Sequence, residues 1–143
     1  MGDPWRRNVG LLALTLAVAA GSLALERTPA PDGVALYFIS PEDGASVESP
    51  VTVRFGLRGM GVAPAGVSTP NTGHHHLLVD AGLPPLGQPI PADSQHRHFG
   101  AGQTEVSLEL APGSHTLQLL LGDQNHIPHD PPIVSERVTI TVR

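Results

Sequence analysis

The order of hydrophobic and polar residues separates an apolar N-terminal stretch from a longer region with a strand-like pattern. From about residue 35 onward, no segment repeats its apolar residues at the helical period, whereas alternation with period two recurs between Gly, Pro and Asp residues. Apolar and polar residues alternate over 51–58, 105–110 and 137–142, so each of these segments is expected to bury one face. The pattern therefore predicts an all-β fold for this region.

About seven short strands are predicted after residue 35. Turn residues separate them, as in Pro41-Glu42-Asp43-Gly44 and Ala111-Pro112-Gly113-Ser114. The predicted strands cover 36–39, 49–57, 73–80, 90–98, 104–110, 114–122 and 133–142, and the pattern is weakest over 90–98. Short strands joined by frequent turns are typical of an immunoglobulin-like antiparallel β-sandwich, which is the fold class that we predict.

The apolar N-terminal stretch has the pattern of a secretory signal peptide. Arg6 and Arg7 precede the apolar residues of 9–25, and small residues suited to cleavage occur over 17–19 and 22–24. The apolar stretch lies at the lower length limit for crossing a bilayer, so an uncleaved anchor is the alternative. Both interpretations place the rest of the chain outside the cytoplasm.

These features predict three parts in the chain. Residues 1–24 are the signal peptide or uncleaved anchor, 25–34 are a flexible Pro-rich lead-in, and 35–143 form one β-sandwich domain. We expect the domain to be periplasmic, or anchored to the outer face of the inner membrane. Contact with the membrane is expected only through the N-terminal segment, if that segment stays uncleaved.

Composition narrows the chemistry that the domain can perform. The chain has eight His and no Cys, which excludes a disulfide framework, a zinc ribbon, an iron–sulfur cluster, a cysteine nucleophile and a Cys-ligated blue-copper site. Its formal net charge is −5, and it has only three Phe, one Tyr and one Trp, so it lacks the basic surface and stacking residues of nucleic-acid binding. Any metal chemistry must therefore rely on imidazole.

Seven of the eight histidines fall into three groups along the sequence. The groups are His74, His75 and His76; His96 and His98; and His126 and His129. If the chain reverses direction at each connection of the predicted sandwich, all three groups lie at one end of the domain. His115 falls at the opposite end. The topology therefore predicts that most of the histidines converge.

The spacing within these groups suits chelation of a metal ion. Residues two apart on a strand face the same side at a separation of about 6.5–7 Å, so His74 can pair with His76, and His96 with His98. His126 adds a nitrogen from a loop that Pro128 stiffens. Neutral imidazole suits copper, zinc, nickel and iron. The predicted metal ligands are His74, His76, His96, His98, His126 and His129.

Two histidines are predicted to be structural. His115 stands alone on an apolar stripe, and His75 points away from its two neighbours, as expected for a buried residue that is hydrogen-bonded near the end of the strand. The other six have an alternative interpretation as a hydrogen-bonded loop network or a pH-responsive surface.

Other residues near the predicted cluster have two interpretations as well. Met60 falls at the same end, where its thioether would favour Cu(I), and packing beneath the loops is the alternative. Asp93, Asp123 and Asp130 flank the histidines and would orient their rings, or else only cap turns.

Three segments rich in histidine carry a family resemblance. They read GHHHLLVD over 73–80, HRHFGAGQTE over 96–105 and GDQNHIPH over 122–129. With these blocks the chain resembles a bacterial family catalogued as domain of unknown function 4399, over about residues 37–142. The resemblance implies a small exported protein and supports the choice of histidines. It implies no activity, because the role of that family is not established.

The function that we predict is an exported histidine-rich metal-binding domain that buffers or delivers an ion, with copper ahead of zinc in the affinity order of nitrogen sites. Its expected partners are the metal ion and another exported protein, and nucleic acid is not among them. A non-metal interaction or structural module of immunoglobulin-like fold is one alternative.

A metal-dependent redox or hydrolytic enzyme is the other alternative. Three imidazoles and an open position would activate water on zinc or allow redox turnover on copper. However, the chain has no GxSxG motif, and no His follows either of the small-residue cleavage positions, so an N-terminal histidine brace does not form. We therefore expect a role without catalysis.

Overall fold

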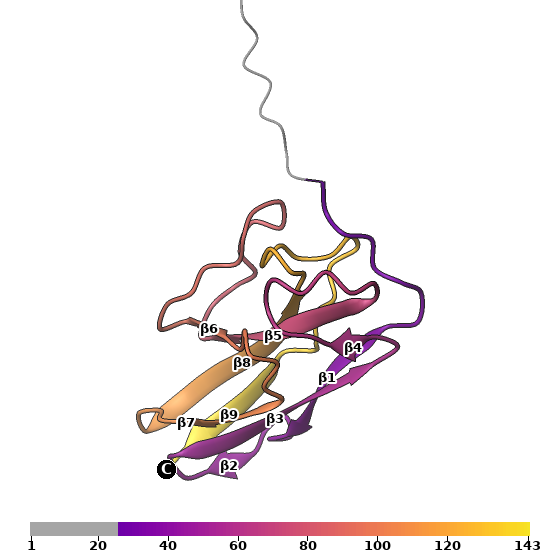
Figure 1. Cartoon of the computed structure of the whole chain (residues 1–143). Coiled ribbons are helices and arrows are strands. Elements are labelled where there is room, and N and C mark those ends of the chain that lie inside the picture. The colour runs from indigo at the N-terminus through magenta and orange to yellow at the C-terminus, as the bar shows by residue number, and fades with distance from the viewer. Residues whose placement is uncertain (1–25) are drawn as a thin grey trace, which may run out of the picture.

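Two β-sheets pack face to face in the computed structural model, which describes residues 26–143 (Figure 1). The strands are β1 (Ala35–Ser40), β2 (Ser46–Val47), β3 (Val51–Arg58), β4 (Gly61–Val62), β5 (Thr72–Val79), β6 (His96–His98), β7 (Glu105–Leu108), β8 (Gly113–Gly122) and β9 (Val138–Val142). These residues contain no helix, so the prediction of an all-β sandwich is confirmed. Accordingly, no helix within this range has the length and hydropathy to cross a membrane. The predicted signal peptide lies outside the described residues.

The strand order places β5 in the middle of the larger sheet. One sheet has the order β1-β3-β7, and the other has the order β2-β9-β8-β5-β4, with β6 also paired to β5. Most pairs are antiparallel, while the short strands β2 and β4 pair in parallel with β9 and β5. The weakly predicted strand 90–98 is reduced to the three residues of β6, which join β5 rather than the smaller sheet.

The hydrophobic core lies between the two sheets and follows from the alternation in the sequence. Val53 on β3, Leu117 and Leu119 on β8, and Ile140 on β9 are each fully buried, and they pack in one cluster. Their polar neighbours along each strand face outward, which is the expected arrangement for a strand that buries one face.

Strand β5 departs from this arrangement because it is buried on both faces. Every residue from Gly73 to Val79 is buried. Leu77 and Val79 face the core between the sheets, whereas Leu78 faces the opposite side. Two long connections, 80–95 and 123–137, gather at this end of the molecule (Figure 1). These two connections cover the outer face of β5, and several histidine side chains lie in the space between the sheet and the connections.

The Pro-rich segment that we expected to be a flexible lead-in is hydrogen-bonded to the rest of the domain. The backbone N–H of Ala30 donates to the carbonyl oxygen of Asp130 at 2.9 Å, and the N–H of Asp130 donates to that of Thr28 at 2.9 Å. Pro29 and Asp130 form a parallel bridge there. Residues 27–30 thus form a short extended segment beside the β8–β9 connection. The part of the chain that packs on the domain therefore begins at Arg27, several residues before the first strand.

Candidate metal centre

Four imidazole rings converge between the larger sheet and its covering loops. They belong to His74, His76, His98 and His126. The ring centroid of His74 lies 4.8 Å from that of His76, 5.1 Å from that of His98 and 5.0 Å from that of His126. The ring of His98 lies 4.7 Å from that of His126 and 5.1 Å from that of His76. We refer to these residues as the four-histidine cluster.

Strand pairing brings three of the four rings together. His74 and His76 project from the outer face of β5 because they are two residues apart on one strand. His98 on β6 is the direct antiparallel partner of His76, so its side chain emerges on the same face. The fourth ring comes from the β8–β9 connection, where His126 ends a tight turn with a φ of 66°.

Glycines leave room for two of the rings. A Cβ atom added at Gly122 would lie 2.7 Å from Cε1 of His76, and one added at Gly100 would lie 2.2 Å from Cε1 of His98. Real side chains do not approach so closely, so any larger residue at either position would displace an imidazole. Gly100 and Gly122 therefore act as the walls of the cluster. Neither glycine was among the residues predicted from the sequence, although both lie within the histidine-rich blocks.

The solvent exposure of the four side chains increases from the interior of the cluster to its edge. His74 and His76 are 0% and 1% exposed, His126 is half-buried, and His98 is exposed. Both ring nitrogens of His74, and Nδ1 of His76, are buried without a hydrogen-bond partner within residues 26–143. Such unpaired groups are rare in folded proteins, and each typically costs about 1–3 kcal/mol. The ring nitrogens are therefore available to another ligand.

Burial and mutual proximity lower the pKa of three of these rings, those of His74, His76 and His98. Burial first, and then the positive charges that His126 and His98 would carry, lower the pKa of His74 from 6.5 to about 4. Burial, followed by His74, His98 and His126, lowers the pKa of His76 to about 2. The pKa of His98 is also lowered, by burial and by His126. Neutral imidazole is the form that coordinates metal ions, so the cluster is ready to bind at neutral pH.

The distances fit a metal ion after small movements of the rings. One nitrogen each from His74, His76 and His98 can be chosen so that all three lie within 4.8 Å of one another. A tetrahedral ion about 2.0–2.1 Å from each nitrogen would hold its ligand nitrogens roughly 3.4 Å apart. Binding therefore requires the three rings to move somewhat closer together. The cluster can therefore hold a metal ion.

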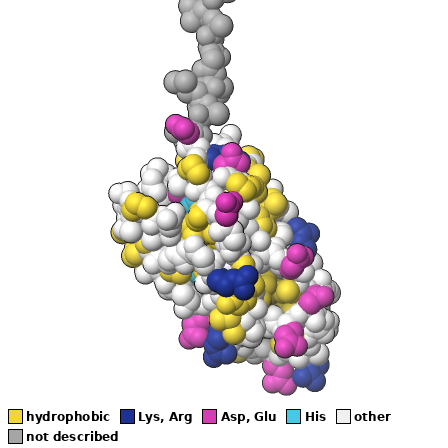
Figure 2. Space-filling model, turned by 90° about the vertical axis from the view of Figure 1, so that its right-hand side faces the viewer, with side chains coloured by type: hydrophobic (Ala, Val, Ile, Leu, Met, Phe, Trp, Pro, Cys, Tyr) yellow, Lys and Arg dark blue, Asp and Glu magenta, His cyan; other side chains and the backbone are white. Residues whose placement is uncertain are grey.

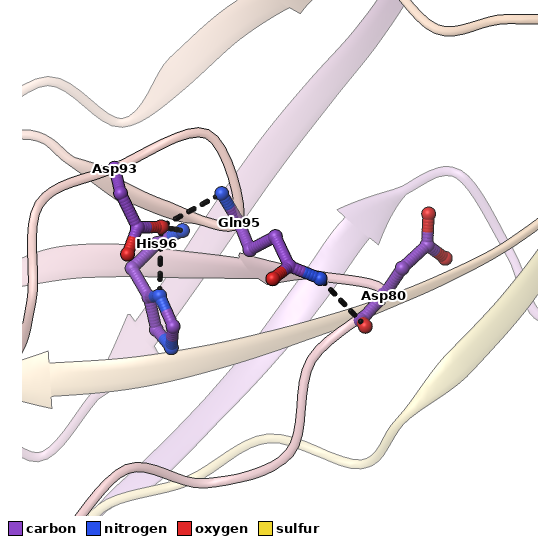
Figure 3. Close-up of polar contacts among 4 residues, drawn as sticks. All are labelled: Asp80, Asp93, Gln95 and His96. Atoms are coloured by element: carbon purple, nitrogen blue, oxygen red, sulfur yellow. Dashed lines mark hydrogen bonds and ion pairs between the residues drawn. The ribbon is translucent and has the colours of Figure 1, made fainter.

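The structure does not bring His96 into the cluster. Its antiparallel partner on β5 is Leu78, which lies two residues after His76 on the same face of the strand. Nδ1 of His96 lies 2.8 Å from Oδ1 of Asp93, an oxygen that also accepts the backbone N–H of Gln95 and of His96 itself (Figure 3). Asp93 therefore orients a ring, as the sequence suggested, but the ring belongs to a side chain outside the cluster.

His129 also lies apart from the four rings. It is 1% exposed, and both of its ring nitrogens lack a hydrogen-bond partner within the described range. Burial lowers its pKa, although Asp123 and the backbone of Leu121 and Thr72 act in the opposite direction.

The two histidines predicted to be structural have separate environments. His75 faces the core, with its ring centroid 5.1 Å from that of Phe55, and burial lowers its pKa to about 4. Its nitrogens have no hydrogen-bond partner within residues 26–143, which differs from the satisfied group that we expected. His115 is held by Asp80 and by the carbonyl oxygen of Ala111.

Met60, Asp123 and Asp130 each have surroundings that distinguish between the two interpretations given above. Met60 is partly buried and packs against the hydrophobic core. Asp130 pairs with Arg27 at 3.3 Å. Asp123 is 2% exposed and accepts hydrogen bonds from the backbone of Asn125 and Ile127, on either side of His126. It supports the turn rather than a ring.

Figure 2 shows one face of the molecule with its side chains coloured by type. On the face shown in Figure 2, acidic and basic side chains are scattered, and histidine appears only as small areas between other residues. This view agrees with a net charge of −5 spread over the chain and with the burial of most of the cluster.

The fold and the cluster define a β-sandwich domain with a group of histidines that could hold a metal ion. The family described as Domain of unknown function (DUF4399) matches residues 53–143, more than half of the chain. The chain belongs to that family. A search of curated proteins found no match, and a search of solved structures found none either.

Proposed function

We propose that this chain is an exported metal-binding domain that buffers or delivers an ion through His74, His76, His98 and His126. The observation that carries this proposal is the convergence of four imidazole rings, two of which, those of His74 and His76, have buried nitrogens without a partner among the described residues. Isolated unpaired histidines also occur at His75 and His129, but no second imidazole lies beside either ring in the contacts of the described chain. Convergence and unpaired nitrogens together are what a metal site requires.

Copper is the ion that we propose first, and zinc second. Nitrogen ligands bind Cu(II) more tightly than Zn(II), and four imidazoles suit the tetragonal geometry of Cu(II) as well as the tetrahedral geometry of zinc. Four ligands also complete one coordination shell, which the six residues predicted from the sequence would have exceeded.

One side of the four-histidine cluster is open to solution, which favours an exchangeable ion over a permanently bound structural ion. A surface hollow of about 510 Å³ between β6 and β7 has His98 in its lining, so solution reaches this edge of the cluster. Protonation of the exposed imidazoles competes with the metal, and affinity is expected to fall as the pH becomes acidic. An ion held in this way can be taken up and passed on.

The compartment follows from the N-terminal pattern. We propose that the domain is exported to the periplasm, or stays on the outer face of the inner membrane if the N-terminal segment is not cleaved. There it would meet copper and zinc outside the cytoplasm. A second exported protein would receive or supply the ion.

Calorimetric titration of the purified, untagged protein with Cu(II) and Zn(II) tests this proposal. The tag must be absent because the chain has its own run of three histidines. We expect one ion per chain, with a submicromolar Kd and tighter binding of copper. Binding of both ions weaker than micromolar would refute a buffering or delivery function.

A further inference from the structure

The segment 27–30, which we call the N-terminal strap, docks on the connection that presents His126. The guanidinium group of Arg27 donates to the carbonyl oxygens of Pro128, at 3.0 Å, and His129, and it pairs with Asp130. Backbone hydrogen bonds between Thr28 or Ala30 and Asp130 add to these contacts. The strap therefore binds the second half of the β8–β9 connection through side chains and backbone.

Thr28 extends this contact to the turn that contains His126. Its hydroxyl donates to Oδ2 of Asp123 at 2.7 Å. The other carboxylate oxygen of Asp123 accepts the backbone N–H of Asn125 at 2.8 Å and of Ile127 at 3.0 Å. One buried carboxylate thus joins the strap to the residues on both sides of His126.

The conformation of His126 shows why such support is needed. Its φ of 66° lies in the left-handed region, which costs a residue with a side chain about 1–2 kcal/mol. The turn is held by the N–H of His126, which donates to the carbonyl oxygen of Asp123 at 2.9 Å, and by the N–H of Ile90, which donates to that of His126 at 2.8 Å. The other three rings lie on paired strands and need no comparable support.

We propose that the N-terminal strap, acting through Asp123, positions His126 as the fourth ligand of the metal ion. This inference rests on the proposed function. With the strap docked, the ion has four imidazole ligands. When the strap is released, the turn relaxes and the ion is left with the three ligands of β5 and β6. Asp123 and Thr28 are therefore positioning residues for metal binding, and they do not touch the ion.

The decisive variant is Thr28→Val in the full-length protein, because valine keeps the volume of threonine and removes only the hydroxyl. We expect the affinity for Cu(II) to fall about 10–100-fold, the usual effect of losing a contact that orients a ligand. Pulsed electron paramagnetic resonance of the copper-loaded protein should count three imidazoles in the variant and four in the wild type. Thr28→Ser, which keeps the hydroxyl, should restore both readouts.

Amide hydrogen exchange without metal provides an independent readout. In Thr28→Val, the amides of Asn125 and Ile127 should exchange faster, while that of Leu77 on β5 stays protected because the sandwich itself is intact. Arg27→Ala should have a similar effect. Its matched control is Arg54→Ala, which breaks the exposed Arg54–Glu105 pair on the smaller sheet and should alter neither exchange nor copper affinity.

The outcomes separate the strap from the proposed function. If wild-type protein binds neither copper nor zinc, the proposed function is wrong and the positioning role falls with it, whatever the exchange data show. If the wild type binds copper with four imidazoles, and Thr28→Val does so with the same affinity, only the strap proposal is overturned. Weaker binding with three imidazoles, rescued by Thr28→Ser, supports it.

Discussion

Histidines at the two ends of this domain are held in opposite ways. In the four-histidine cluster, His74 and His76 are buried, and three of their four ring nitrogens have no partner within residues 26–143. At the other end, the side chain of His115 is 15% exposed, its Nδ1 lies 2.7 Å from Oδ2 of Asp80, and its Nε2 lies 2.8 Å from the carbonyl oxygen of Ala111.

This difference separates a histidine whose ring is paired within the fold from histidines whose ring nitrogens are available to a ligand. Both partners of His115 are hydrogen-bond acceptors, so the ring donates twice, as only protonated imidazole can. Its pKa is accordingly raised by the hydrogen bond to Asp80 and by the one to Ala111. His74, His76 and His98 have lowered pKa values, and within residues 26–143 no carboxylate is hydrogen-bonded to these three rings. Unlike the isolated unpaired rings of His75 and His129, those of His74 and His76 lie beside other imidazoles.

The largest expected effect is the loss of two ligands from β5. His74→Ala combined with His76→Ala should lower copper affinity by more than about 100-fold, beyond the range expected for losing a supporting contact. The removed nitrogens have no hydrogen-bond partners to lose, so the free energy of unfolding without metal should fall only by the cost of the cavity that the two buried rings leave. Calorimetry and urea unfolding of the same samples provide both numbers.

His115→Ala is the matched control for that variant. It should leave copper affinity unchanged while lowering stability. If His115→Ala and the double variant reduce copper affinity equally, the distinction between the two ends is lost.

The next effect comes from filling the wall of the cluster. Gly122→Ala would place a Cβ 2.7 Å from Cε1 of His76, so the ring must shift. We expect copper affinity to fall about 10–100-fold, and stability to fall by about 1–3 kcal/mol from overpacking. Gly82→Ala is the control, since nothing lies within 4 Å of its added Cβ. Equal copper binding by both variants would show that His76 is not a ligand.

A smaller contrast defines the boundary of the site along β6. His98→Ala should weaken copper binding strongly, whereas His96→Ala should change it by less than about twofold, because Asp93 binds the ring of His96. Competition titrations with a coloured chelator measure both affinities. If the His96 variant shows the greater loss, the pairing of β5 with β6 is shifted from the register described.

The smallest effect concerns the pH dependence of the end that contains His115. The raised pKa of His115 gives stability that is complete below pH 6.5 and is lost as the pH rises through that raised value. Burial acts to raise the pKa of Asp80, but hydrogen bonds from His115 and the backbone of Thr116 outweigh it and lower that pKa. Its contribution is therefore complete above pH 3.8 and is lost as the pH falls through the lowered value.

Urea unfolding across the pH range measures this contribution. The difference in stability between wild type and Asp80→Asn should be largest between about pH 4 and 6.5 and should shrink at higher and lower pH. A difference that grows above pH 7 would contradict the assigned protonation of His115.

The fold could be predicted largely from the sequence because period-two alternation is a local signal. Strand β9 and the buried residues of β3 follow from it directly. The expected topology placed His74, His76, His98 and His126 at one end of the domain, although it did not pair β6 with β5. What the sequence could not provide was the register between β5 and β6, which pairs His76 with His98 and thereby places His96 opposite Leu78.

Long-range contacts account for the remaining differences. His126 and His129 lie in the same loop, and both were candidate metal ligands from the sequence. Only the turn around Asp123 decides which of the two rings faces the cluster. The docking of the strap depends on a hydrogen bond between Thr28 and Asp123, residues 95 positions apart. No local sequence pattern encodes such a contact. A Pro-rich segment that packs on its own domain therefore has the same sequence pattern as a flexible linker.

Nuclear magnetic resonance of the histidine rings during a titration with Zn(II) tests the central claim most directly, because zinc is diamagnetic and each ring reports separately. The account predicts that the ring signals of His74, His76, His98 and His126 shift together and saturate at one ion per chain, while those of His96, His115 and His129 stay in place. Absence of any shift, or saturation of His96 or His129 in place of a cluster ring, would contradict the four-histidine metal site.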